Sequence, residues 1–284
     1  MAESLSHKFG QLIGDLLELA ILPNLKKFAR KHNLFLDKSG IRNARKGIKV
    51  SWPDGNGNKH DLDFVLEHGG TENIIGTPVA FIESAWRRGS RHSKNKAQEI
   101  QGAINPIVLN NKTTVSFKGA ILGGDFTKPS IKQLESDNFS VLYFPTELFE
   151  KAFKKFNLDI ISDDTTQEIE FEKRILAWEN FQRKEELHKE LLKLNKVEVD
   201  KFFNSFSDSI SRFIVQVIIL PLHGLESISN SVTEAINFLT TYSEDKSKLP
   251  HIRYEIIIRY NTGDKIEVSF KEKRHTIDFL EKHL

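Results

Sequence analysis

The segment from His60 to Glu99 constrains the fold more than any other part of the chain. It begins with H-D-L-D-F-V-L-E, continues through a glycine-containing interruption to P-V-A-F-I-E-S-A-W-R-R, and ends in a basic polar run that leads to K-N-K-A-Q-E-I. The largely apolar run from Val79 to Trp86 is typical of a strand that is buried on both faces of a sheet. An acidic residue in one strand is thus followed by a glutamate, Glu83, in a second strand. We expect the two carboxylates to meet in the fold and to form a site for a hard divalent cation such as Mg²⁺.

Composition restricts the classes of function. The 284 residues suffice for one large domain or two modest ones, and the 39% hydrophobic and 28% charged residues are ordinary for a globular protein. The absence of cysteine excludes a disulfide scaffold, a thiolate zinc site and a cysteine nucleophile, and fits a cytoplasmic protein. The longest apolar run, Phe213 to Leu222, is too short to span a bilayer, and acidic residues interrupt the N-terminal region where a signal peptide would lie. We therefore expect no membrane partner.

Charge is nearly balanced over the whole chain but clustered locally. The formal net charge is +2, and basic residues gather in the ranges Lys26 to Lys31, Arg42 to Lys49 and Arg87 to Lys96. Such clusters on a near-neutral chain suit a nucleic-acid cleft and equally suit a solvated surface.

The first 160 residues alternate between helical and strand patterns. Helices are expected over residues 4–32, 93–109, 131–137 and 147–156, and strands over residues 47–52, 61–67, 79–86, 117–123 and 139–145. This order predicts an α/β fold of the α+β kind, with a central mixed sheet flanked by helices.

The composition changes after Asp159, where the polar stretch Asp163 to Thr166 interrupts the pattern. We expect a boundary here, with one domain over residues 1–160 and a second part over residues 161–284. The second part is expected to contain helices over residues 165–195, 197–220 and 225–242, a β-hairpin over residues 251–271 and a short terminal helix. We interpret this helical region and its hairpin as a dimerisation or DNA-recognition part.

Asp63 and Glu83 form the strongest candidate pair. Phosphodiester hydrolysis needs a metal that polarises the phosphate and activates a water, together with a cation against the charge that develops at phosphorus. Both acids could instead be surface residues paired with Lys and Arg, but Glu83 follows Val-Ala-Phe-Ile, and an acid at the end of an apolar strand favours a functional site. Asp61 lies on the same strand face as Asp63 and stays an alternative, although Asp63 lies deeper in the strand.

This pattern resembles the PD-(D/E)xK nuclease superfamily, to which most Type II restriction endonucleases belong. In that family an aspartate on one strand precedes a Glu-x-Lys on the next strand, and Asp63 and Glu83 match the two acids. The helix that contains G-Q-L-I-G-D-L-L-E resembles the N-terminal helix that often supplies a further glutamate, here Glu18. The resemblance covers roughly residues 8 to 145 and implies a restriction-endonuclease-like core.

One position departs from the family pattern. Ala85 occupies the place where the family usually has lysine. Lys96, on the expected helix after the strand, is our candidate replacement, with Lys94 and Arg88 as alternatives. Gln98 resembles a glutamine found on that helix in some branches of the family.

The remaining candidates each have a structural alternative. Glu18 lies on the helix face opposite the apolar residues, where a solvated polar face explains it equally well. Lys96 could simply be an exposed lysine near a helix start. The DNA-binding candidates are basic or amide side chains that could contact phosphate or form a solvated loop: Arg87, Arg88, Arg91, Lys94 and Gln98.

The resemblance implies a Mg²⁺-dependent endonuclease that hydrolyses double-stranded DNA, most simply a Type II restriction enzyme that acts as a homodimer, because a palindromic site is matched by a two-fold protein. Asp63 and Glu83 would bind the metal, with Glu18 and Lys96 as further catalytic residues. Two alternatives stay open: another DNA nuclease in repair or phage defence, and a catalytically inactive DNA-binding or assembly module of the same fold.

Overall fold

The computed structural model describes residues 4–111, 114–160, 165–211, 213–222, 224–244, 250–260 and 263–284. The chain forms two compact units, Met1–Phe206 and Ser207–Leu284. The expected boundary near residue 160 differs from this division, and Asp163 and Asp164 of the polar stretch that suggested it lie outside the described residues.

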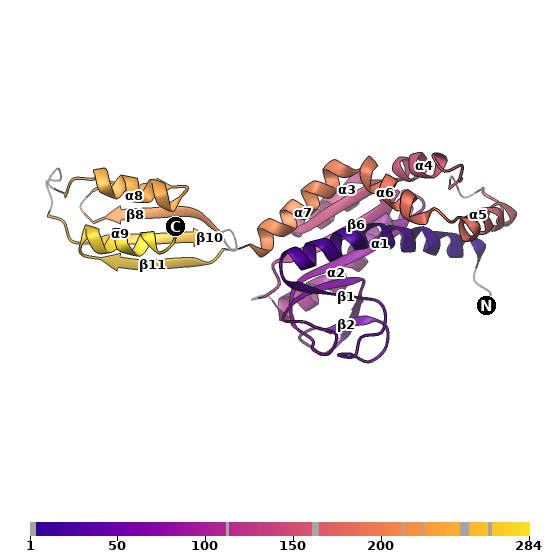
Figure 1. Ribbon diagram of the computed structural model, residues 1–284, viewed down its shortest axis with the longest axis horizontal. Coiled ribbons are helices and arrows are strands. Elements are labelled where there is room, and N and C mark those ends of the chain that lie inside the picture. The colour runs from indigo at the N-terminus through magenta and orange to yellow at the C-terminus, as the bar shows by residue number, and fades with distance from the viewer. Residues whose placement is uncertain are drawn as a thin grey trace. The chain divides into compact units, whose positions relative to one another are not determined.

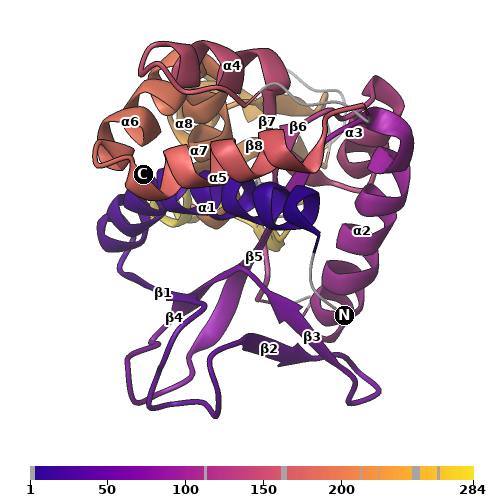
Figure 2. The same ribbon diagram turned by 90° about the vertical axis from the view of Figure 1, so that its right-hand side faces the viewer.

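A five-stranded mixed sheet forms the centre of the first unit, in the order β1-β4-β5-β6-β7 (Figures 1 and 2). Its strands are β1 (Leu34–Lys38), β4 (Phe64–His68), β5 (Thr77–Arg87), β6 (Phe117–Gly124) and β7 (Phe139–Pro145). The first three strands pair antiparallel and the last three pair parallel. Helices α2 (Ser93–Asn110) and α3 (Lys128–Ser136) make the crossovers that parallel pairing requires. This arrangement confirms the predicted α/β fold class.

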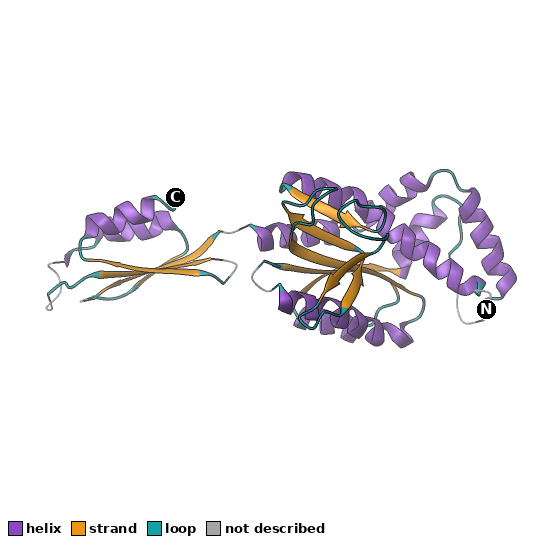
Figure 3. Ribbon diagram, turned by 90° about the horizontal axis from the view of Figure 1, so that it is seen from below, coloured by secondary structure: helices purple, strands orange, loops and turns teal. Residues whose placement is uncertain are grey.

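Helices cover both faces of this sheet (Figure 3). On one face, Phe81 and Ala85 of β5 join a buried core with Ile100 and Ile104 of α2. The other face is covered by α1 (Leu5–Lys31), α4 (Thr146–Lys154) and α7 (Lys196–Ile210). At Gly123 an added Cβ would lie 3.0 Å from atoms of Leu17 and Phe149, so this position accommodates the close approach of α1 and α4.

Helix α1 begins within one residue of the predicted start, and it is followed by strand β1, which we did not predict from the sequence. The Ser4 side chain caps it by accepting from the N–H of His7, and Pro23 lies inside the helix without ending it. The chain then passes through Asn33, whose φ of 53° is the left-handed conformation common after a helix, and enters β1.

The predicted single strand over residues 61–67 is in fact two strands. β3 (Lys59–Leu62) pairs with β2 (Val50–Pro53), whereas β4 pairs with β1 and β5. The chain changes partner at Asp63, so the β2–β3 hairpin leaves the main sheet at this residue (Figure 2).

The predicted helix over residues 165–195 is also divided, into α5 (Glu168–Asn180) and α6 (Lys184–Leu194). The extended backbone at Phe181 ends α5. Both helices contact α1, and the Phe9 and Phe171 rings lie 5.7 Å apart. Because α5, α6 and most of α7 complete the core of the first unit, the compact unit extends to Phe206 instead of ending near residue 160.

The second unit is an antiparallel sheet with helices on one face (Figure 3). Its strands are β8 (Ile214–Pro221), β9 (Ser227–Ser229), β10 (Tyr254–Tyr260) and β11 (Lys265–Phe270), in the order β11-β10-β8-β9. Helices α8 (Val232–Thr241) and α9 (Lys273–Glu281) pack on the face that carries Ile256 and Ile258. The hairpin and terminal helix predicted here are confirmed. The helix predicted over residues 197–220 is correct only as far as Ile210, because the β-branched run after Phe213 forms the central strand β8. The helix predicted over residues 225–242 is confirmed from Val232 onward, after the short strand β9.

Candidate functional site

The change of partner at Asp63 creates an open notch in the sheet. The β4–β5 register ends at Phe64 and Ile82, whereas β6 stays paired with β5 as far as Arg87. Beyond Ile82, β5 has no residue of β4 opposite it. The Asp63 carboxylate takes the place of this partner, because its Oδ2 accepts a hydrogen bond of 2.7 Å from the N–H of Ser84. Side chains from both layers of helices can therefore reach the same part of β5.

Three carboxylates come together at this notch. Burial raises the pKa of Glu83 to about 9, and the charges of Asp63 and Glu18 add to the effect. Burial, followed by repulsion from Asp63 and Asp15, raises the pKa of Glu18 to about 7. Burial also raises the pKa of Asp63. Like charges raise each other's pKa only at short range, so Glu18, Asp63 and Glu83 share one electrostatic environment.

Lys96 contributes the positive charge of the site. Its ammonium lowers the pKa of both Asp63 and Glu83 against the effect of burial. Its Nζ also lies 3.1 Å from Oε2 of Glu99, which in turn lies 3.7 Å from Nη2 of Arg87. Lys96 therefore lies beside the acids, as we expect of a residue that replaces the family lysine absent at Ala85. It also pairs with Glu99, an exposed residue of its own helix.

The donor set fits a hydrated divalent cation. Oε1 of Glu83 is buried without a hydrogen-bond partner, an arrangement that costs free energy unless a proton or cation occupies the position. Across the part of the chain that the structure describes, no group of three or more His, Asp or Glu side chains is arranged to hold a metal ion. Mg²⁺ commonly uses only one or two carboxylates and completes its octahedron with waters and substrate phosphate, so Asp63 and Glu83 can suffice.

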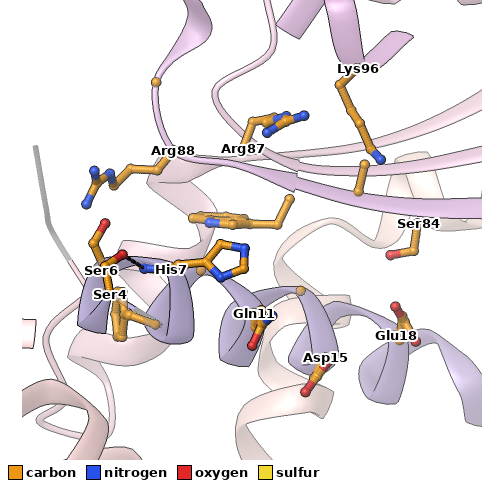
Figure 4. Close-up of a pocket in the computed structure, with 16 residues that line it drawn as sticks. Ser4, Ser6, His7, Gln11, Asp15, Glu18, Ser84, Arg87, Arg88 and Lys96 are labelled. Atoms are coloured by element: carbon orange, nitrogen blue, oxygen red, sulfur yellow. Dashed lines mark hydrogen bonds between the residues drawn. The ribbon is translucent and has the colours of Figure 1, made fainter. Parts of the chain in front are cut away.

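Two cavities lie beside the acidic cluster of Glu18, Asp63 and Glu83. The first, which we call the groove, has a volume of about 490 Å³ and runs along α1 past β5. Figure 4 shows the α1 side chains of Gln11 and Glu18 on one wall and those of Arg88 and Lys96 on the other. The second, which we call the side pocket, has a volume of about 280 Å³. Asp15 and Glu18 line both cavities, so the two are adjacent at the acidic cluster.

The predicted DNA-binding residues separate into two groups. Arg87 and Arg88 line the groove. Arg91, in the short 3₁₀ turn before α2, and Lys94 and Gln98, on α2, are exposed and lie outside the lining of both cavities.

Asp61, the alternative to Asp63, lies on the β2–β3 hairpin. It pairs there with Lys49 at 2.6 Å and accepts from Ser51. The structure therefore favours Asp63 as the acid that faces Glu83.

The basic range Arg42 to Lys49 contains two structural arginines that the sequence did not distinguish from surface residues. Arg42 is 3% exposed and pairs with Asp37 and Glu67, each at 2.7 Å. Arg45 lies 3.1 Å from the same Asp37. Part of this cluster is thus a buried ionic network and does not form a nucleic-acid surface.

No family model and no curated protein matches the chain. A crystallised protein of unknown function, AF1548, is similar over 68% of this chain and 97% of its own, with 12% identity and a TM-score of 0.30. Among the described helices, none combines the length and the apolar character needed to cross a membrane.

The raised carboxyl pKa values predict how stability depends on pH. A carboxyl group with a higher pKa in the folded state binds more protons when folded, so its stabilising effect is present at acidic pH and is lost as pH rises through the folded pKa. In the presence of EDTA, the free energy of unfolding should therefore fall between about pH 5 and the pKa of Glu83, about 9. Urea denaturation at a series of pH values measures this slope. Glu83→Gln should flatten it, and an unchanged slope in that variant would contradict the assigned burial.

Proposed function

We propose that this protein is a divalent-cation-dependent nuclease that hydrolyses phosphodiester bonds of DNA. The observation that carries the proposal is the convergence of Glu18, Asp63 and Glu83 with Lys96, where Glu18 and Lys96 line the groove and Asp63 lines the side pocket. The resemblance of the Asp63 and Glu83 spacing to PD-(D/E)xK nucleases supports the same class of reaction.

Each residue has a chemical role in this proposal. Asp63 and Glu83 would hold a Mg²⁺ ion, which supplies charge stabilisation at the phosphate and acidifies a bound water. Asp63 is held in position by the N–H of Ser84. Glu18, with a pKa of about 7, is suited to accept a proton from the attacking water at neutral pH. Lys96 would place its ammonium against the charge that develops on the phosphoryl oxygens.

The groove can orient a strand of DNA. Arg87 and Arg88 line it next to the acids, and guanidinium groups bind phosphate oxygens in pairs. A DNA backbone in the groove would present one phosphate to the acids and a neighbouring phosphate to these arginines. The groove therefore suits an extended polyanion better than a small neutral substrate.

A Type II restriction enzyme that acts as a homodimer on double-stranded DNA is the specific form of this proposal. Digestion of a sequenced plasmid in the presence of Mg²⁺ distinguishes it from other nucleases. Discrete bands support restriction, and smearing or degradation from ends supports a repair or defence nuclease. Binding of DNA without cutting in Mg²⁺ or Mn²⁺ would support the inactive module, an alternative favoured by the pairing of Lys96 with Glu99.

Replacement of Lys96 tests the catalytic assignment. Lys96→Met should lower kcat by about 10²- to 10³-fold with a smaller change in KM, because it removes a cation that acts mainly in the transition state. Lys132→Met is the matched control, since Lys132 is an exposed lysine of α3 outside both cavities. Steady-state cleavage of a labelled duplex measures both constants. Equal kcat values for the two variants would remove Lys96 from the mechanism.

A further inference from the structure

The side pocket has features that metal binding does not explain. It is lined by Glu18 and Asp63, whereas the two arginines Arg87 and Arg88 line the groove. Its walls include three apolar side chains, from Leu19, Leu22 and Phe64. An apolar hollow beside carboxylates that hold a cation would suit a ligand in which an apolar surface is joined to an anionic group, because the anion would bind the cation.

Leu19 is the most informative of these residues. It is 52% exposed, although it lies one position after Glu18 on a helix whose other face is buried in the core. Its side chain and that of Leu22 come from successive turns of α1, so they form one continuous apolar wall. This wall would stay in contact with water unless a ligand covered it.

The polar side of the pocket is held rigidly. Lys38 and Ser39 form it at the end of β1. The Lys38 carbonyl accepts a hydrogen bond of 2.8 Å from Nη2 of Arg45, and Arg45 is held by Asp37, which also pairs with the buried Arg42. The buried ionic network thus restrains the backbone that carries Lys38 and Ser39, and the Lys38 Nζ donates to the Ser39 carbonyl at 3.2 Å.

The volume of the pocket limits the ligand. At about 280 Å³ it lies just below the usual range for sites that take drug-sized molecules, so it suits one planar ring system with polar edges. Nucleobases fit this description, since enzymes that bind a single base stack it against apolar side chains and hydrogen-bond its edge.

We propose that the side pocket receives one unstacked nucleobase from the nucleotide next to the scissile phosphate. This inference rests on the proposed nuclease function and adds a substrate preference to it. A base inside a continuous duplex must be unpaired and flipped out of its stack to reach the pocket, which costs free energy. A strand that is single or locally opened at the cut avoids this cost and is therefore the preferred substrate. Leu19 and Leu22 would contact the face of the base, and Lys38 and Ser39 would bind its polar edge.

The test compares two small ligands in the presence of Mg²⁺. Thymidine 5′-monophosphate carries both phosphate and base, whereas 2-deoxyribose 5-phosphate lacks the base, and NMR chemical-shift titration yields both dissociation constants. The wild-type protein should bind the nucleotide about tenfold more tightly, as expected for covering one face of a base. Leu19→Trp should fill the pocket and remove this preference while leaving the affinity for the sugar phosphate unchanged.

Leu176→Trp is the matched control. Leu176 is a helical leucine with 51% exposure on α5 and is not part of the lining of either cavity, so its replacement should keep the tenfold preference. Thermal unfolding of both variants checks that they are folded. Equal affinity of the wild-type protein for the two ligands, or an unchanged preference in Leu19→Trp, would overturn the base pocket and leave the nuclease proposal in place. Absence of binding by both ligands would count against the phosphate site itself, and the base pocket would fail with it.

Discussion

Glu83→Gln should reduce the rate of Mg²⁺-dependent DNA cleavage by at least about 10³-fold, because metal-ion catalysis stabilises the transition state by several kcal/mol. The substitution keeps the size of the side chain and removes the negative charge that a cation requires. Since burial already favours the uncharged form of Glu83 without metal, the variant should fold as well as the wild-type protein. Cleavage of a labelled duplex under single-turnover conditions measures the loss.

Asp61→Asn provides the control for this prediction. Asp61 lies two residues before Asp63 and carries the same charge, but its side chain is exposed and paired with Lys49 on the β2–β3 hairpin. Its replacement should leave the cleavage rate within about twofold, as is usual for a change in one exposed ion pair. Full activity in Glu83→Gln, or an equal loss in both variants, would contradict the assignment of Glu83.

Arg42→Met should destabilise the first unit by about 3–5 kcal/mol, the usual effect of removing one partner from a buried ion pair. Arg42 has only 2% of its side chain exposed, and its guanidinium bridges the buried carboxylates of Asp37 and Glu67. It also donates to the carbonyls of Thr71 and Ile74, which fixes the loop between β4 and β5. Methionine fills the space but leaves the buried Glu67 without a cation and Asp37 with Arg45 as its one remaining arginine partner among the described residues.

Differential scanning calorimetry can measure this effect as a fall in Tm of about 6–20 °C, at about 2–4 °C for each kcal/mol. Arg183→Met is the matched control, because Arg183 forms an exposed pair with Glu186 in the same unit. That variant should lose less than about 1 kcal/mol. A Tm of Arg42→Met within one or two degrees of the control would show that the buried network does not support the fold.

Local patterns in the sequence predict much of the first unit. Local sequence patterns alone predict the apolar strand β5, the strand β6 and the helix α2 that begins at Ser93. The amphipathic pattern of α1 also places Glu18 on the face away from the core, and this face lines the groove. These predictions succeed because each element is defined by residues that are close together in the chain.

The geometry of the site depends on interactions that no local pattern contains. Nothing in the run from Asp61 to Glu67 indicates that Asp63 separates two strands with different partners. The strand β1 was missed because it is short and follows a long helix, although Asn33 is a typical residue for the left-handed turn between them. As a result the side pocket, which includes Lys38 and Ser39, could not be predicted.

The sequence also did not predict which charged residues are buried. Arg42 and Arg87 belong to similar basic clusters, yet Arg42 is buried against two acids and Arg87 lines the groove. The difference arises from Asp37 and Glu67, which are brought to Arg42 by the pairing of β1 with β4. Only the fold determines which member of a basic cluster is structural.

We propose that Asp63 and Glu83 hold one cation between them. Titration with Mn²⁺, followed by electron paramagnetic resonance, tests this proposal most directly. We predict one saturable ion per chain in the wild-type protein and in Asp61→Asn, and loss of that ion in both Asp63→Asn and Glu83→Gln. Unchanged Mn²⁺ binding in these last two variants would contradict the claim.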